Sequence, residues 1–418
     1  MGFQNTMSYQ DKITDFDHAI AKLDSRMRVL IPPGCGEPQA LVRALCDRAE
    51  RFRGLTLVSG LLLTDYPFLD PKFADHFRYL TTHVMPGSRK AIAERRAEFV
   101  PMRLFDAPRV FGKEGPLRVD AVLLQVSPPD KDGRVSLGPS ASNPLPLAKQ
   151  ADLVIAQVNP RCPRTLGNSS LSLEEIDCLV EHEEELVEYR SPKVGEVERK
   201  IAEHIVPLIP RGATLQIGIG NVPEAMLQSL PQGLELSLAG MAVDTMVDLV
   251  ERSVVTGPWR AIELMGTRKL FDFAHENPRL EMQDSLTGHN PLWLGKIPKF
   301  VSVNSAVEVD LSGQVNAESL GGEQISGLGG QFDFVEASYW SEGGFSIFAF
   351  PSASGKSGEF SRIVKQLKPG AAISTPRYFT RFVVTEYGVA DLWGKSLKDR
   401  AAALIRIAHP KFQNQLAT

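Results

Sequence analysis

The sequence predicts an α/β protein made of two tandem open α/β domains. Three observations support this: apolar runs of strand length recur, helical patterns separate them, and one strand–turn–helix–strand unit occurs twice. The runs are mostly continuous rather than alternating, as in sheets that are covered on both faces. They include residues 121–126, 153–156, 215–219, 346–350 and 382–384.

The clearest helical pattern lies near the C-terminus. Ser396 is suited to cap its first turn, and Pro410 follows its end. Its apolar residues share one face at helical spacing: Leu397, Ala401, Leu404, Ile405 and Ala408.

The repeated unit consists of a strand, a glycine turn, a helix that starts near a proline, and a second strand. It occurs at residues 29–60 and again at residues 215–240. Any two βαβ units share these features, so a chance likeness remains one interpretation. The other interpretation is two similar halves joined near residues 190–198. It predicts domains 1–190 and 191–418, with the ligand cleft between them.

Composition excludes several classes of protein. Hydrophobic residues make up 43% and charged residues 23% of the 418 residues, which is ordinary for a globular protein. The formal net charge of -4 gives no basic excess for nucleic acid. No apolar run approaches the roughly 20 residues that cross a bilayer. We therefore expect a cytoplasmic protein without a nucleic-acid or membrane partner.

Cysteine and histidine spacing gives no sign of a metal site. The four cysteines lack a CxxC pair, and the histidines are scattered. We expect neither a metal nor a disulfide framework. The opening Met1-Gly2-x-x-x-Thr6 fits a short myristoylation pattern that often arises by accident.

Two glycine-rich segments are candidates for binding an anion or a carbonyl oxygen. Gly218-Ile-Gly-Asn-Val-Pro223 leads from a strand into a helix, whose first N–H groups are free to bind. Residues 321–333 contain five glycines within ten residues and can present several backbone N–H groups. The alternatives are a plain strand–helix turn and a flexible surface loop. The apolar Ile325, Leu328 and Phe332 favour an ordered loop.

Acidic residues give weaker signals. Glu308 and Asp310 share one face of a predicted strand, where they could do acid–base work or simply bind a loop. Residues 385–391 (TEYGVAD) could line a pocket or be structural. The acidic run 181–185 is expected to be an exposed helix face.

Taken together, the motifs resemble the acetyl-CoA hydrolase/transferase family, within it the 4-hydroxybutyrate CoA-transferase-like branch. The resemblance spans nearly the whole chain. Its motifs are residues 36–41 (GEPQAL), 125–130 (QVSPPD), 155–160 (IAQVNP), 163–167 (PRTLG), 215–221 (LQIGIGN), 308–315 (EVDLSGQV), 327–331 (GLGGQ) and 383–391 (VVTEYGVAD).

The resemblance implies two tandem CoA-transferase-type domains, a C-terminal CoA site, and chemistry that moves coenzyme A between carboxylic acids. In the family a glutamate attacks the acyl-CoA thioester, giving an acyl–glutamyl anhydride and then a glutamyl-CoA thioester. The substrates would be a small acyl-CoA and a carboxylate, and a homo-oligomer is expected. Carried over by motif, the CoA contacts are Gly218, Ile219, Gly220, Asn221, Val222, Val307, Gly329 and Gly330.

The sequence departs from this pattern at the nucleophile. With Met241 and the residues after it aligned, Gly240 stands where the family has its glutamate, and glycine cannot form a glutamyl thioester. Gly60 ends the matching strand of the first half. A second departure is Phe345, where the family commonly has a lysine.

No other carboxylate replaces this glutamate clearly. Glu235 lies about 16 Å back along an extended strand. Glu308 and Glu386 match residues that the family already has beside its nucleophile, and Asp244 has a shorter side chain. These three are weak candidates, and the catalytic residue stays unassigned.

Three functions remain open. The first is a CoA-transferase or acyl-CoA hydrolase that uses a stand-in nucleophile or direct attack by water. The second is an acyl-CoA decarboxylase, lyase or acyltransferase that needs no covalent glutamate. The third is a non-catalytic subunit that binds a CoA thioester. The acyl group would be set by first-half residues around 34–37 and 59–62.

Overall fold

The computed structural model describes residues 9–65 and 67–418, so the Met1-Gly2 pattern lies outside the described residues. The chain divides into two compact units, each described by itself. The first comprises the chain up to Tyr189 together with Arg260–Gly288, and the second Arg190–Trp259 with His289–Thr418. The expected domains 1–190 and 191–418 assign residues 260–288 differently, and that division stays a prediction.

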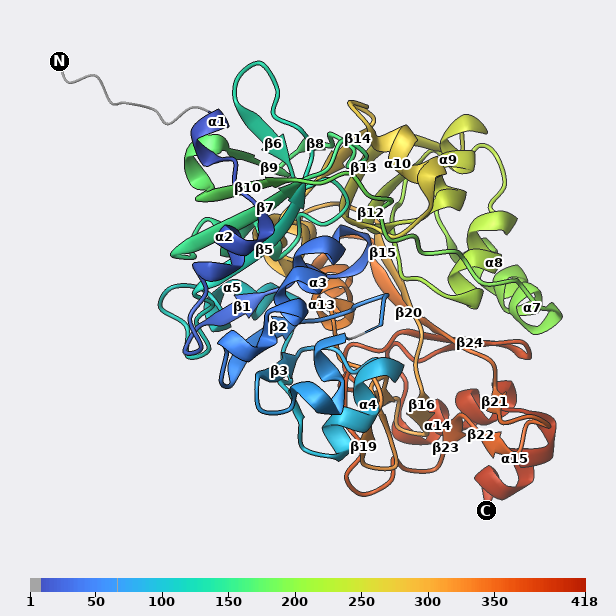
Figure 1. Cartoon of the computed structure of the whole chain (residues 1–418). Helices are drawn as coiled ribbons and strands as arrows, with labels where there is room; N and C mark the ends of the chain where they lie inside the picture. The colour runs from blue at the N-terminus through green and yellow to red at the C-terminus, as the bar shows by residue number, and fades with distance from the viewer. Residues whose placement is uncertain (1–8, 66) are drawn as a thin grey trace. The chain divides into compact units, whose positions relative to one another are not determined.

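A seven-stranded sheet forms the centre of the first unit, in the order β10-β7-β5-β1-β2-β3-β4. All its neighbouring strands run parallel. Figure 1 shows β1, β2 and β3 (blue) beside β5 and β7 (green). The strands are β1 (Arg28–Leu30), β2 (Leu55–Ser59), β3 (Phe77–Thr81), β4 (Ala97–Phe99), β5 (Ala121–Val126), β7 (Leu153–Val158) and β10 (Cys178–Glu181).

Shorter strands and eight α-helices complete the described part of the first unit. The strands are β6 (Arg134–Ser136), β8 (Leu166–Gly167), β9 (Ser170–Ser172) and β14 (Leu280–Met282). The helices are α1 (Tyr9–Lys12), α2 (Phe16–Ala21), α3 (Gln39–Asp47), α4 (Pro86–Ala93), α5 (Ala107–Val110), α6 (Pro144–Ala148), α10 (Arg268–Ala274) and α11 (Ser285–Gly288).

The main sheet of the second unit has the order β25-β24-β20-β15-β11-β12. Its strands pair in parallel except for the antiparallel β24–β25 pair. They are β11 (Thr214–Ile217), β12 (Leu236–Ala242), β15 (Phe300–Asn304), β20 (Phe345–Ala349), β24 (Phe382–Thr385) and β25 (Gly388–Asp391). The chain passes from the second unit back to the first along β13 (Val255–Leu264).

Seven helices and several short strands surround this sheet. The helices are α7 (Glu196–Ile205), α8 (Asn221–Ser229), α9 (Asp244–Glu251), α12 (Pro291–Leu294), α13 (Gln331–Trp340), α14 (Leu397–Ile407) and α15 (Pro410–Ala417). The strands are β16 (Glu308–Asp310), β17 (Val315–Asn316), β18 (Ser319–Leu320), β19 (Glu323–Gln324), β21 (Ala353–Ser354), β22 (Phe360–Ser361) and β23 (Ile363–Val364).

Burial on both faces explains the continuous apolar runs. Every residue of β5 and β7 is buried, and their side chains divide between two apolar clusters. Leu123 and Ile155 belong to one cluster, whereas Leu124 and Ala156 belong to the other. The predicted α/β class is confirmed.

The repeated unit is also confirmed. Strands β1 and β2 pair in parallel, with Val29 opposite Leu57, and β11 and β12 do the same, with Leu215 opposite Leu238. Helix α3 connects the first pair of strands, and α8 connects the second. In both units the chain therefore leaves a strand at its carboxyl end through a glycine turn, which is the edge where parallel sheets bind ligands.

The acidic run at residues 181–185 is not helical, so that prediction was wrong. Glu181 ends β10, and the carboxylate of Glu184 accepts hydrogen bonds from Ala40 N and Gln157 Nε2 at 2.9 and 2.8 Å. Arg43 pairs with the same carboxylate at 2.5 Å. These contacts fix the segment as extended chain. Among the described residues, no helix is long and apolar enough to cross a membrane.

Candidate functional site

The glycine turn of the second unit connects β11 to α8. Gly220 is the N-cap of α8 with φ +123°, a conformation that favours glycine. Glycine has no side chain to accept from the first helical N–H groups, which leaves them for an acceptor on a ligand. A Cβ on Gly218 would meet no atom within 4 Å. This turn therefore has both the donors and the open space that an oxyanion or phosphate needs.

Gly240 lies beside this turn. It pairs with Ile217 across the parallel β11–β12 ladder, and it is buried. Its φ is +92°, and a Cβ there would lie 3.1 Å from Cγ of Gln216 and 3.7 Å from Cζ of Phe334. The side chains next to the expected nucleophile position are thus an amide on β11 and a ring in the first turn of α13.

The second glycine segment is ordered, as its apolar residues favoured. It begins at the turn of the β18–β19 hairpin, includes β19, and ends in α13, whose N-cap is Gly330. Ile325 N donates to Glu318 O at 2.9 Å, and Gln331 Nε2 donates to Ser305 O at 2.8 Å. Gly329 has φ +58°. Helix α13, like α8, therefore begins at a glycine that provides no capping side chain, and its Phe334 lies beside Gly240.

A buried histidine and aspartate lie next to this loop. His289 Nδ1 is 3.3 Å from Asp333 Oδ2, and the two side chains are 1% and 0% exposed. A Cβ on Gly330 would overlap His289 Cε1 and lie 2.6 Å from its Nδ1. The rings of His289 and Phe334 are 5.0 Å apart between centroids. Sequence reasoning missed His289 because His289 and Asp333 are far apart in the chain and form no motif.

The three weak carboxylate candidates have different surroundings. Glu308 Oε1 accepts from Asn316 Nδ2 at 3.0 Å, and Glu386 accepts from Ser352 N and Oγ at 2.8 and 2.6 Å. Asp244 begins α9, four residues after Gly240, and is half-buried. Glu308 and Glu386 therefore already hold structural hydrogen bonds. Whether any of the three acts in catalysis stays a prediction.

Asp310, predicted on the same strand face as Glu308, has a structural role. Its Oδ1 accepts from Ser312 N and Gln314 N at 2.9 and 3.0 Å, so the carboxylate closes the β16–β17 turn.

Two of the predicted CoA contacts, Val307 and Asn221, already have hydrogen bonds within the chain. Val307 N donates to Asn316 O at 2.8 Å, and Val307 O accepts from Arg362 Nε at 2.9 Å, so its backbone is already paired. Phe345 packs its ring against Phe382, with Arg381 above it at 5.3 Å from the ring centroid. Arg381 therefore supplies a positive charge beside the position where a lysine was expected. Asn221 Nδ2 donates to Lys193 O at 3.1 Å.

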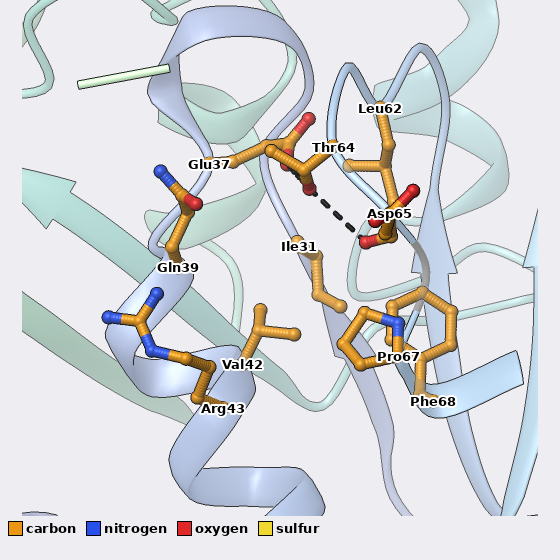
Figure 2. Close-up of a pocket in the computed structure, with 10 residues that line it drawn as sticks. All are labelled: Ile31, Glu37, Gln39, Val42, Arg43, Leu62, Thr64, Asp65, Pro67 and Phe68. Carbon is orange, nitrogen blue, oxygen red and sulfur yellow. Dashed lines mark hydrogen bonds between the residues drawn. The ribbon is translucent and has the colours of Figure 1, made fainter. Parts of the chain in front are cut away.

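The first unit contains a cavity of about 240 Å³ near the residues that sequence reasoning proposed for the acyl group. Figure 2 shows Gln39 and Arg43 of α3 on one side and Pro67 and Phe68 on the other, with Glu37 above. The cavity is lined by Ile31, Glu37, Gln39, Val42, Arg43, Leu62, Thr64, Asp65, Pro67 and Phe68.

Glu37 is the buried carboxyl of this cavity. It accepts from Leu63 N and Thr64 Oγ1, both at 2.5 Å. Burial raises its pKa, and the bonds from Thr64 and Leu63 act in the opposite direction. Of the two predicted segments, 34–37 thus contributes Glu37 and 59–62 contributes Leu62 to the cavity.

Glu263 is a second buried carboxyl of the first unit. It forms an isolated β-bridge with Ser140, and its Oε2 has no hydrogen-bond partner among the described residues. Burial raises its pKa well above the ordinary value. Within the described part of the chain, no three His, Cys, Asp or Glu side chains are grouped to hold a metal ion.

Comparison with known proteins identifies the family. The acetyl-CoA hydrolase/transferase N-terminal domain model matches residues 3–189, and the C-terminal domain model matches residues 266–418. The chain is 41% identical over 417 residues to 4-hydroxybutyrate coenzyme A transferase of Clostridium kluyveri, covering 98% of this chain and 97% of the relative.

Solved structures agree with the predicted two-domain architecture. RipA from Yersinia pestis matches with a TM-score of 0.90 at 29% identity, covering 98% of this chain and 97% of RipA. A 4-hydroxybutyrate CoA-transferase from Porphyromonas gingivalis matches with a TM-score of 0.83 at 28% identity, covering 98% and 97%. The chain is an enzyme with the two-domain CoA-transferase fold, and it belongs to the acetyl-CoA hydrolase/transferase family.

Proposed function

We propose that the chain releases coenzyme A from the thioester of a small carboxylic acid, with water as the acyl acceptor. The CoA thioester would bind at the carboxyl edge of the second unit's sheet, where the glycine turn, Gly240 and the Gly329–Gly330 loop come together. The predicted contacts are Gly218, Ile219, Gly220, Asn221, Val222, Val307, Gly329 and Gly330.

Gly240 is the observation that carries this proposal. A ping-pong transferase needs a carboxylate that stores the acyl group while one acid leaves and the next enters. Position 240 offers only backbone, whereas two uncapped helix starts lie near it. Their N–H groups can stabilise the oxyanion that forms when water attacks the thioester carbonyl. The site thus retains carbonyl polarisation but lacks a side chain for the covalent step at this position.

CoA transfer to a second carboxylate is the alternative, favoured by the name of the 41% identical relative. It would need a stand-in nucleophile such as Asp244, or a direct attack by the acceptor acid. The expected homo-oligomer and cytoplasmic location also stay predictions.

A panel of short acyl-CoA thioesters tests the proposal. Each is incubated with and without acetate, while free CoA, free acid and the intact mass of the protein are recorded. We expect CoA and acid in equal amounts, no dependence on acetate, and no covalent CoA adduct. An adduct, or acetyl-CoA formed from added acetate, would establish transfer instead. Another product, or binding without turnover, would indicate an acyl-CoA lyase or decarboxylase, or a binding subunit.

A further inference from the structure

The imidazole of His289 is buried without a hydrogen-bond partner. Neither Nδ1 nor Nε2 has one among the described residues, and the side chain is 1% exposed. A buried polar group in this state destabilises the fold, so its retention calls for a partner outside the chain, such as water or a ligand. Buried waters typically satisfy such groups.

The surroundings of His289 place it in the proposed catalytic region. Its ring packs on Gly330, the N-cap of α13, and on Phe334. Phe334 is also the ring that a Cβ on Gly240 would approach to 3.7 Å. From these contacts and the size of a phenyl ring, the imidazole centre lies within about 10 Å of the position that a side chain at residue 240 would occupy. Only a glycine at position 330 leaves room for this imidazole.

Asp333 gives the imidazole an electrostatic partner. Its carboxylate lies 3.3 Å from Nδ1, within ion-pair range, and both groups are removed from solvent. A carboxylate at Nδ1 favours the tautomer with its proton on that nitrogen and stabilises the imidazolium after Nε2 takes a proton. The contact is an ion pair without hydrogen-bond geometry here, and catalytic contacts are often long before substrate binds.

We propose that His289, positioned by Asp333, is the general base that activates water in place of the missing carboxylate nucleophile. This inference rests on the proposed hydrolysis. The water oxygen forms a bond to the thioester carbon while its proton passes to Nε2. The carbon–sulfur bond then breaks, and the imidazolium returns the proton to the leaving sulfur. The products are the free acid and CoA.

Burial also limits what the imidazole can activate. A ring that is 1% exposed is closed to bulk solvent, and placing a second carboxylate there without a counter-charge would be costly, whereas a water molecule is small and neutral. We therefore expect water to be the acceptor.

The test compares His289→Asn and His289→Ala with His204→Asn, a control histidine on α7 of the same unit. Free CoA release is followed by a thiol assay, and CoA binding by calorimetry. We expect His289→Asn to lose about 100-fold or more in kcat, the typical contribution of general base catalysis, with CoA affinity unchanged. Added imidazole should restore the rate of His289→Ala in proportion to its concentration, which a purely structural histidine would not allow.

Two outcomes would overturn the assignment. One is a His289→Asn rate within about threefold of wild type, and the other is a folded, CoA-binding His289→Ala that imidazole does not rescue. Either would leave the proposed hydrolysis intact. A wild-type protein that releases no CoA from any thioester would overturn the proposed function itself, and the role of His289 with it.

Discussion

Replacing Gly240 tests whether a glutamate at this position restores covalent catalysis. The change is Gly240→Glu, with Gly240→Ala to separate the backbone from the carboxylate. A non-glycine residue at φ +92° costs about 1–2 kcal/mol. The added Cβ would lie 3.1 Å from Gln216 Cγ, so the amide side chain must shift. Its 3.4 Å hydrogen bond from Asn304 would weaken, at a cost of about 1 kcal/mol.

The expected free-energy loss is therefore about 2–3 kcal/mol for either substitution. For a unit of roughly 200 residues, this lowers Tm by about 4–12 °C. Two control substitutions separate the contribution of backbone strain to this free-energy loss from that of side-chain contact. A Cβ on Gly212 meets nothing within 4 Å, but its φ is +74°, so Gly212→Ala reports backbone strain alone. Gly218 has equal space without a positive φ, and Gly218→Ala should unfold close to wild type.

Circular dichroism measures the thermal unfolding of each variant. Intact-mass spectrometry after addition of acyl-CoA detects a covalent adduct. Despite its lower stability, Gly240→Glu should gain a covalent CoA adduct and acetate-dependent CoA transfer, whereas Gly240→Ala should gain neither. If Gly240→Ala unfolded at the same temperature as Gly218→Ala, the argument that a positive φ at position 240 is costly would be refuted. A folded, CoA-binding Gly240→Glu without an adduct would show that its carboxylate is not presented to the thioester.

Three further predictions concern buried groups of the first unit and the thiols. Burial raises the pKa of Cys35 to about 12, and all four cysteines are buried and free, so a thiol reagent at pH 8 should modify none before unfolding and four after it. Burial raises the pKa of Glu263 well above 4.5, so in the folded state this carboxyl stays protonated to a higher pH than in the unfolded state. The free energy of unfolding should therefore fall as pH rises above about 4.5, by about 1.4 kcal/mol per pH unit, until the folded-state pKa is passed. Glu263→Gln should remove that part of the slope in urea unfolding followed between pH 4 and 8, and an unchanged slope would contradict it. Thr64→Val removes a 2.5 Å hydrogen bond to Glu37 and should cost about 1–3 kcal/mol in urea unfolding, whereas a loss near zero would mean that solvent satisfies this carboxyl.

The strands were predictable because burial on both faces leaves a continuous apolar run. The run 121–126 coincides with β5, and Ser396 caps α14 by accepting from Asp399 N, as its position suggested. The run 215–219 ends two residues early in β11, because the glycine turn begins at Gly218. The ends of an element are therefore predictable where a nearby residue in the sequence, such as a turn glycine or a capping serine, determines them.

The acidic run shows where such signals fail. Charge density at residues 181–185 indicated a solvated helix, but Glu184 is held by Ala40 and Gln157, which belong to distant segments. The pairing of His289 with Asp333 has the same origin. No spacing rule links two residues that tertiary packing alone brings together, so the sequence predicted the glycine loop without the imidazole beneath it.

The roles proposed for Gly240 and His289 are linked only in the folded chain, where both residues lie beside Phe334. Without a carboxylate at position 240, the acyl group has no covalent holding place there, and in the proposed hydrolysis it passes from sulfur to water within one complex. A carboxylic acid acceptor would then need its own anion site beside the thioester. Water needs only a base, and the buried imidazole against Gly330 is the base that we propose. In the proposed function, the absence of a carboxylate at position 240 therefore favours hydrolysis over transfer through the enzyme.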